Sequence, residues 1–439
     1  QNGVRLGLWG GPDGFGNTPE SAEERKEMLV SLCRNYDWAL FKFDAVCGPL
    51  REEKEDLFVD MIGECRKYSP DLILLNHRLG LKKAEQCATT FLWEGKESYI
   101  DVNSFNTCAA PHNRVGALGR GLVPDLKRLT EDHGVCLSSC LDYWEDELVL
   151  QAFNRSLLLS PQIYGNPWLL SDREFPKLAR IFNLHRKFSG LLVDGIELPS
   201  AYGKYAVSRG DDKTRLITLR NLTWEPQKVN IVLDHEIGLE ECKRVKCRLY
   251  HPVERILGIY NYGESVEVTV LPFRSMLFYA SADESLDGIG VEGTDFEIIK
   301  DVVGKPIEIN LLGFAGTQSH IKLNNLPGVE KIEMDGQDVT KKLSNSKTMN
   351  INFEGGKYSK SYHRKIADLS PVSIPYDVNT LYEATVFAAD NNAMEVRSLY
   401  RSGTTKIEQV EEARNAFFNQ SAFVNRGVWD KNLFDGRMN

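Results

Sequence analysis

The chain has 439 residues, enough for two or three domains, and 42% of them are hydrophobic, which is typical of a globular protein with a large core. Its net charge is −9 and no lysine-rich or arginine-rich run stands out, so nucleic acid is not expected as a partner. No apolar run reaches the roughly 18 residues that a membrane span requires, so no span is expected.

Short apolar runs alternate with helical stretches over residues 1–190. Apolar runs bounded by turn residues predict strands, and apolar residues that recur every three or four positions predict helices. Thr18 and Pro19 are a typical N-cap and first residue for the first helix. The predicted strands are 5–9, 38–44, 71–76, 89–93, 134–140 and 161–165. The later predicted helices are 53–68, 124–133, 145–159 and 172–188.

This alternation of strand and helix predicts a parallel sheet that is covered by helices. A (β/α)8 barrel of the TIM type uses about 31 residues per unit, so six units fit the length of this region. We therefore predict a partial catalytic barrel over 1–190. Residues suited to chemistry follow the predicted strands, where a barrel has its catalytic edge: Trp9, Asp44, Asn76, His77, Arg78, Trp93, Glu94 and Cys140 to Asp142.

A doubly wound sheet is the alternative fold for this region. The loop after the first strand, "GGPDGFG", lacks the G-x-G-x-x-G spacing of a dinucleotide site. The nine cysteines are an odd number in a long chain and do not suggest a disulfide scaffold. His133, Cys136 and Cys140 come nearest to a metal cluster, but their spacing fits no strong zinc signature. No metal and no cofactor are therefore expected.

From residue 197 the pattern changes to short strands between polar turns. Such strands predict an antiparallel β-sandwich over 197–284. A second all-β stretch, 285–370, is expected to be a small accessory sandwich, with 285–293 as the linker. Residues 371–439 are expected to be the start of a carbohydrate-binding module, because "VWDKNLFDG" resembles discoidin-type modules.

The chain begins at Gln1 and enters a predicted strand almost at once. We therefore expect a piece of a longer protein, with a barrel truncated at its N-terminus and any targeting segment outside the chain. A secreted or periplasmic location is expected for the whole protein.

The stretch "LFKFD", residues 40–44, places two charges in an apolar strand. Side chains alternate between the faces of a strand, so Lys42 and Asp44 are predicted to share one face. A lysine nearby favours the ionised form of an aspartate, and such a carboxylate at a strand end is suited to attack on an anomeric carbon. A structural ion pair is the alternative.

The same stretch, "FKFDAVCG", resembles the nucleophile strand of retaining α-galactosidases and their relatives. "RLGLWGGPDGFG" resembles the strand and loop that precede it, and "DELVLQAFNRSLLLSPQIYGNPWLLSD" resembles the later helix and last strand. The resemblance covers about residues 4–281. It implies a barrel followed by a β-sandwich, and hydrolysis of terminal α-linked sugars with retention, most of all α-galactosides.

The resemblance also implies roles for individual residues. Asp44 would form the glycosyl-enzyme and Lys42 would bind a sugar hydroxyl. The family's acid/base is an aspartate after its sixth strand, but "TTFLWEGKESYID" departs from that pattern, and the candidates are Glu97, then Glu94, then Asp101. The further candidates for binding an oligosaccharide or polysaccharide substrate are Trp9, Asn76, His77, Arg78, Trp93 and Asp142.

Each candidate also has a structural explanation. Trp93 is equally suited to packing, His77 and Arg78 to pairing with a carboxylate, and the acidic run 142–147 to a helix N-terminus. Two other functions stay open. One is a carbohydrate-binding protein on a hydrolase barrel that has lost its acid, and the other is an α-glucosidase or transglycosylase relative.

Overall fold

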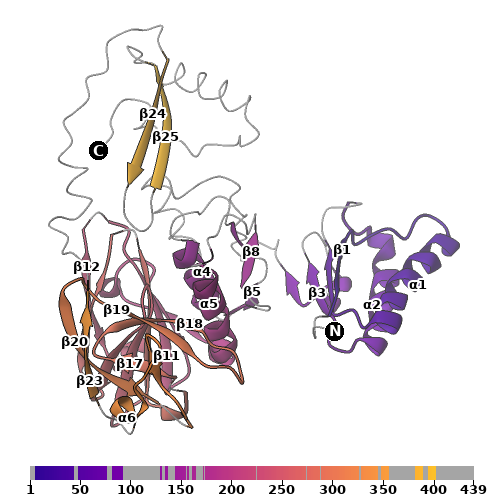
Figure 1. Ribbon diagram of the computed structural model, residues 1–439. Coiled ribbons are helices and arrows are strands. Elements are labelled where there is room, and N and C mark those ends of the chain that lie inside the picture. The colour runs from indigo at the N-terminus through magenta and orange to yellow at the C-terminus, as the bar shows by residue number, and fades with distance from the viewer. Residues whose placement is uncertain are drawn as a thin grey trace. The chain divides into compact units, whose positions relative to one another are not determined.

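The computed structural model divides into two compact units, which are described separately (Figure 1). The first contains Gln1–Tyr99, Val123–Asp132 and Leu157–Leu159, and the second contains the rest of the chain. The structure describes residues 5–43, 48–76, 82–91, 129–130, 134–136, 144–154, 156–157, 161–164, 172, 174–223, 225–272, 274–286, 288–325, 328–344, 348–354, 381–388 and 394–401.

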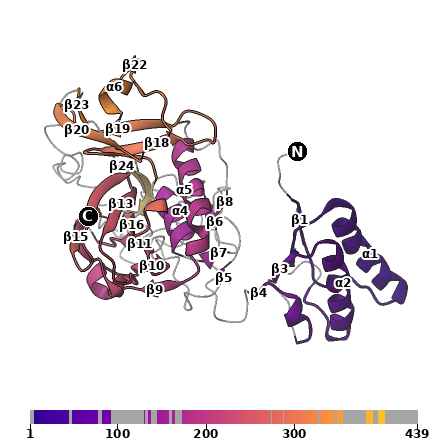
Figure 2. The ribbon, with the colours of Figure 1, turned by 90° about the horizontal axis from the view of Figure 1, so that it is seen from below.

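The first unit is built on a parallel sheet of four strands in the order β1-β2-β3-β4. The strands are β1 (Gly7–Gly10), β2 (Leu40–Phe43), β3 (Ile73–Asn76) and β4 (Thr90–Phe91). The helices are α1 (Pro19–Tyr36) and α2 (Glu55–Tyr68), with short 3-10 helices η1 (Glu52–Lys54) and η2 (Ala84–Cys87). Figure 1 and Figure 2 show α1 and α2 on one face of this sheet.

The first helix starts where its sequence predicts. Thr18 is the N-cap, and its side chain accepts a hydrogen bond from the Ser21 backbone N–H at 3.2 Å. The Ser21 hydroxyl in turn accepts from the Thr18 backbone N–H, which completes a capping box. The helix ends before Asp37, which adopts a left-handed conformation with φ 52° and donates its N–H to the Cys33 carbonyl. Both ends are therefore fixed by local chemistry.

One apolar core joins the two helices to the sheet. Phe41 and Phe43 of β2 are completely buried, and the Phe43 ring meets the Phe58 ring of α2 edge-on, with centroids 5.5 Å apart. Leu29 of α1 and Leu74 of β3 belong to the same cluster. Because side chains alternate along a strand, the residues between these belong to the other face of the sheet.

The last two predicted strands of the barrel region form a separate parallel pair in the second unit, β6 (Gly134–Cys136) with β8 (Gln162–Tyr164). Two helices follow as predicted, α4 (Trp144–Phe153) and α5 (Phe175–Phe188). A helix was predicted over 124–133, but Leu129–Thr130 form the strand β5 instead. The helix predicted over 145–159 ends earlier, because α4 stops at Phe153 and Ser156–Leu157 form the strand β7. Both segments are rich in leucine, whose spacing over a few residues suits strand or helix. The closed or truncated barrel stays a prediction.

A six-stranded antiparallel sheet follows, in the order β14-β13-β16-β11-β10-β9, and a two-stranded sheet, β12-β15, lies against it. Alternate residues of β11 and β16 pack on opposite sides. Leu216 and Leu277 contact the cluster that contains α4 and α5, whereas Ile217 and Phe278 contact the cluster of the smaller sheet. The strands are β9 (Gly195–Glu197), β10 (Val207–Gly210), β11 (Thr214–Arg220), β12 (Gln227–Val232), β13 (Val245–His251), β14 (Arg255–Tyr260), β15 (Ser265–Val270) and β16 (Ser275–Ser281).

The described strands between residues 290 and 353 share a small core around Phe296 and Ile321. Part of the predicted linker 285–293 is not a linker, because Gly290–Glu292 form β17 and pair with β20. The elements are β17, β18 (Asp295–Lys300), β19 (Glu308–Leu312), β20 (Thr317–Asn324), β21 (Glu333–Met334), β22 (Gln337–Asp338), α6 (Thr340–Leu343), β23 (Thr348–Phe353) and the hairpin β24 (Leu381–Ala388) and β25 (Met394–Arg401).

Among the described residues, no helix is long and apolar enough to cross a membrane.

Candidate active site

Trp9 and Lys42 stand next to each other on neighbouring strands. The register of the parallel sheet pairs Trp9 of β1 with Lys42 of β2, and Lys42 with Leu75 of β3. Phe41 and Phe43, on either side of Lys42, are buried among the helices. The row Trp9, Lys42 and Leu75 therefore belongs to the face of the sheet that is turned away from the helices.

This row joins an exposed aromatic ring to a cationic side chain. The Trp9 side chain is 59% exposed, Lys42 is half-buried, and Leu75 is buried. Both Trp9 and Lys42 are the second-last residues of their strands, so they stand at the carboxyl edge of the sheet. An aromatic face and an ammonium group are what a sugar ring with its hydroxyls requires for stacking and hydrogen bonding.

The loops that follow β1 and β2 meet at a buried ion pair. The Asp13 carboxylate is buried and accepts from Arg51 Nε at 2.7 Å and Arg51 Nη2 at 3.0 Å. The backbone N–H groups of Gly14, Phe15 and Arg51 also donate to it. Arg51 and these N–H groups hold the pKa of Asp13 far below its usual range. Asp13 is therefore ionised at neutral pH and is held on the same edge as Trp9 and Lys42.

Most of the predicted site residues lie outside the described part of the chain: Asp44, His77, Arg78, Trp93, Glu94, Glu97, Asp101 and Asp142. Asn76 ends β3, and the register pairs it with Phe43 and Phe91 rather than with Lys42. Of the predicted set, the structure thus brings Trp9 and Lys42 together. Their roles, and those of the other predicted residues, stay predictions.

Asp13 and Arg51 are absent from the residues predicted for the site. A signal for them exists, because an acidic and a basic residue stand in two loops that follow neighbouring strands of a predicted parallel sheet. Their pairing depends on the strand order, which motif spacing alone does not supply.

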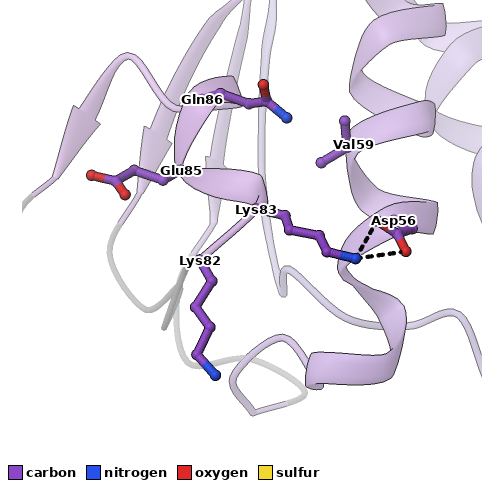
Figure 3. Close-up of a pocket in the computed structure, with 6 residues that line it drawn as sticks. All are labelled: Asp56, Val59, Lys82, Lys83, Glu85 and Gln86. Atoms are coloured by element: carbon purple, nitrogen blue, oxygen red, sulfur yellow. Dashed lines mark hydrogen bonds and ion pairs between the residues drawn. The ribbon is translucent and has the colours of Figure 1, made fainter.

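A pocket of about 460 Å³ lies elsewhere on the first unit, beside α2 and η2 (Figure 3). It is lined by Asp56, Val59, Lys82, Lys83, Glu85 and Gln86. Lys83 Nζ lies 3.1 Å from both carboxylate oxygens of Asp56. Since α2 covers the opposite face of the sheet from Trp9 and Lys42, this pocket is separate from the candidate site.

A second group of charged side chains is enclosed in the second unit, between the helices and the six-stranded sheet. Asp146, in the first turn of α4, accepts from Arg274 Nε at 2.8 Å and also pairs with His251. Burial lowers the pKa of His251 to about 4, so the ring is neutral at pH 7 and donates its Nε2–H to Asp146. Asp146 and His251 are completely buried, so this group has a structural role.

No cluster of three or more His, Cys, Asp or Glu side chains that fits a metal ion occurs within the described ranges.

No protein-family model and no curated protein matches the chain. Solved structures similar to it include a candidate α-galactosidase from Bacteroides fragilis, with a TM-score of 0.42 and 12% identity over 64% of this chain and 63% of that one. Another is α-galactosidase I from Mortierella vinacea, with a TM-score of 0.37 and 12% identity over 63% of this chain and 77% of that one.

An α-amylase from Geobacillus thermoleovorans is also similar, with a TM-score of 0.35 and 10% identity over 61% of this chain and 65% of that one. The match spans less than two thirds of the Bacteroides and Geobacillus chains. TM-scores of this size leave the activity to be argued from the residues of this chain.

Proposed function

We propose that the chain is part of a retaining glycoside hydrolase that cleaves terminal α-linked sugars, with α-galactosides as the first substrate class. One observation supports this proposal most. Trp9 and Lys42 stand side by side at the carboxyl edge of a parallel sheet, on the face away from its helices. That edge is where barrel enzymes hold their catalytic residues. A secreted or periplasmic location belongs to the same proposal.

The proposed reaction has two steps. The Asp44 carboxylate attacks the anomeric carbon, and the bond from that carbon to the leaving oxygen breaks as a glutamic acid after Trp93 protonates the oxygen. The glutamate left behind then takes a proton from water, and the water oxygen displaces Asp44 from the anomeric carbon. Two inversions at one carbon give net retention. Glu97 is the first candidate for the acid/base and Glu94 the second.

Lys42 and Trp9 hold the sugar in this scheme. The ammonium group of Lys42 donates to a ring hydroxyl, and its charge favours the ionised form of Asp44 two positions later. The exposed indole of Trp9 offers an apolar face to the less polar side of the sugar. Binding by these two groups orients the anomeric carbon toward the strand end that carries Asp44.

The test uses nitrophenyl glycosides of α-galactose, α-glucose, α-N-acetylgalactosamine and β-arabinopyranose. The proposal predicts fastest turnover of the α-galactoside, and proton NMR of the first-formed product should show retention. Product of inverted configuration would overturn the mechanism. Binding of sugars without turnover of any glycoside would favour the carbohydrate-binding alternative, and preference for the α-glucoside would change the substrate class.

A further inference from the structure

We propose that Asp13 and Arg51 are positioning residues that fix the catalytic edge of the first unit. This inference rests on the proposed function, because the loops that they join flank the strand end assigned to catalysis. Neither residue is proposed to touch the substrate. They act through the backbone on either side of β2.

The Asp13 carboxylate is a shared acceptor for two loops. From its own loop it takes the N–H groups of Gly14 at 2.6 Å and Phe15 at 3.3 Å. From the loop after β2 it takes the backbone N–H of Arg51 at 3.2 Å and two guanidinium N–H groups. Its side chain is only 6% exposed, so water competes little for these bonds. One buried carboxylate therefore connects the loop after β1 to the loop after β2.

Arg51 extends the same connection along the first loop. Its Nη2 donates to the Gly16 carbonyl and its Nη1 to the Asn17 side-chain oxygen, each at 2.8 Å. Gly16 has φ +61°, and a Cβ there would lie 2.3 Å from the Ser21 hydroxyl, so the loop passes close to the start of α1 at a position that requires glycine. Phe15, in the same loop, is completely buried and belongs to the apolar core of the first unit. The loop after β1 is thus a rigid support against which Arg51 is held.

The described residues on either side of the proposed nucleophile are both held in place. One is Phe43, locked by its register with Gly10 and Asn76 and by burial. The other is Arg51, locked by Asp13. Asp44, the proposed nucleophile, directly follows the first of them. Replacing Arg51 or Asp13 would remove one of these two anchors while leaving Trp9 and Lys42 in the sheet, so we expect turnover to suffer more than binding.

The opposite edge of the same sheet carries a matched cluster. Arg5, before β1, donates from Nη2 to Asp37 at 2.8 Å and to Asp71 at 3.0 Å, and these carboxylates precede β2 and β3. Like Arg51, Arg5 is an arginine that connects segments next to neighbouring strands. It does so at the amino edge of the sheet, where barrel enzymes do not hold catalytic groups. Arg5→Gln is therefore the control variant.

The experiment compares Asp13→Asn, Arg51→Lys and Arg5→Gln in the full chain. A misplacement of about 1 Å can lower a rate about 100-fold, so we expect kcat for the α-galactoside to fall about 10- to 100-fold in the first two variants with KM within about threefold. Arg5→Gln should keep kcat within about twofold. Unchanged kcat in Asp13→Asn, or an equal loss in Arg5→Gln, would overturn the inference.

Hydrogen–deuterium exchange of the peptide covering residues 40–51 is the second measurement. Faster exchange is expected in Asp13→Asn and Arg51→Lys and not in Arg5→Gln, at a temperature where all variants are folded. Equal exchange in all chains would contradict the positioning role. This measurement needs no turnover, so it decides the inference even if the wild-type chain hydrolyses none of the glycosides and the proposed function fails.

Discussion

Lys42 lies between two phenylalanines that are completely buried against α2, yet its own side chain is on the other face of the strand. A lysine is rarely placed among apolar residues unless it pairs or binds. Its neighbour across the strands is the exposed Trp9, so at the scale of single residues the sheet edge has the polar and aromatic groups of a sugar subsite. In the proposed function, the nucleophile and the acid/base complete this subsite.

The acid/base is testable through the leaving group. Replacing the true acid, Glu97→Gln or else Glu94→Gln, should slow glycosides with poor leaving groups about 100- to 10,000-fold, because general acid catalysis supplies a factor of that size. Substrates with dinitrophenol as leaving group need little protonation and should be slowed far less. Equal slowing of both substrate classes in both variants would exclude these glutamates.

His185 predicts a dependence of stability on pH. Its ring is buried beside Phe153, and burial lowers its pKa to about 4 from the ordinary 6.5. Between these values the unfolded chain binds a proton that the folded chain does not, so this stabilisation is present above pH 6.5 and is lost as the pH falls toward 4.

The variant His185→Phe isolates this contribution. Between pH 6.5 and 4.5 its free energy of unfolding should fall by less than that of wild type, with a difference of about 2 kcal/mol. Urea unfolding at both pH values measures it. Burial and the neighbouring Asp146 raise the pKa of Glu145, so its contribution to stability increases as the pH falls. Because Glu145 is present in both chains, this contribution cancels when the two chains are compared. Parallel loss in the two chains would show that His185 titrates normally.

At the scale of elements, α5 is joined to the six-stranded sheet by Glu254. This carboxylate is 2% exposed, and it accepts from Arg180 of α5 at 2.7 Å while also pairing with Arg248 of β13. Glu254→Gln leaves two guanidinium groups without their shared anion, and we expect it to cost about 3–5 kcal/mol of unfolding free energy.

The matched control is Glu267→Gln. Glu267 makes an exposed ion pair with Lys228 across β12 and β15, and such pairs contribute at most about 1 kcal/mol. Chemical denaturation of both variants compares the same substitution at a buried and an exposed site. Similar losses in the two would mean that the buried cluster does not hold the helix on the sheet.

The sequence predicts some elements well and others poorly for identifiable reasons. Thr18 caps α1 as predicted, because an N-cap depends on a few adjacent residues. Alternation in "LFKF" predicted a face for Lys42, because one face of β2 is packed by helices. All seven residues of β11 and of β16 are buried, since helices cover one side and a second sheet the other. These strands therefore lack an alternation of apolar and polar residues that could indicate which side chains face the helices and which face the second sheet.

At the scale of the whole molecule, residues 288–301 make direct contacts with β13 and α5. Arg248 of β13 donates to the carbonyls of Gly288 and Ile289, and its guanidinium lies 5.1 Å from the centre of the Phe296 ring. Arg180 of α5 also pairs with Asp301 at 3.0 Å. In a chain that ends at 284, Arg248 would lose the two carbonyl acceptors and Arg180 would lose the Asp301 carboxylate.

Two truncations test this attachment. A chain ending at 284 should be less soluble and unfold at a clearly lower temperature, because it loses both hydrogen bonds and the packing of Phe296. A chain ending at 354 keeps them and should unfold near the full-length value. Thermal unfolding of both provides the comparison. If the shorter chain is as stable as the longer one, residues 285–354 are an independent module.

The predicted catalytic pair comes from separate parts of the sequence, because Asp44 follows β2 and the candidate glutamates follow β4. Trp9 and Lys42 were each accessible to reasoning from one strand, whereas Asp13 and Arg51 were not predicted, because their pairing joins two loops that are far apart in the sequence. The distance between Asp44 and its acid depends on long-range packing, which no local pattern encodes.

Azide rescue of Asp44→Gly tests directly whether Asp44 is the nucleophile. With an activated α-galactoside the variant should have no turnover alone, because the nucleophile is gone, and added azide should restore cleavage and yield a glycosyl azide of inverted configuration. NMR identifies that product. If Asp44→Gly keeps more than a few per cent of wild-type activity without azide, Asp44 is not the nucleophile and the proposed mechanism is wrong.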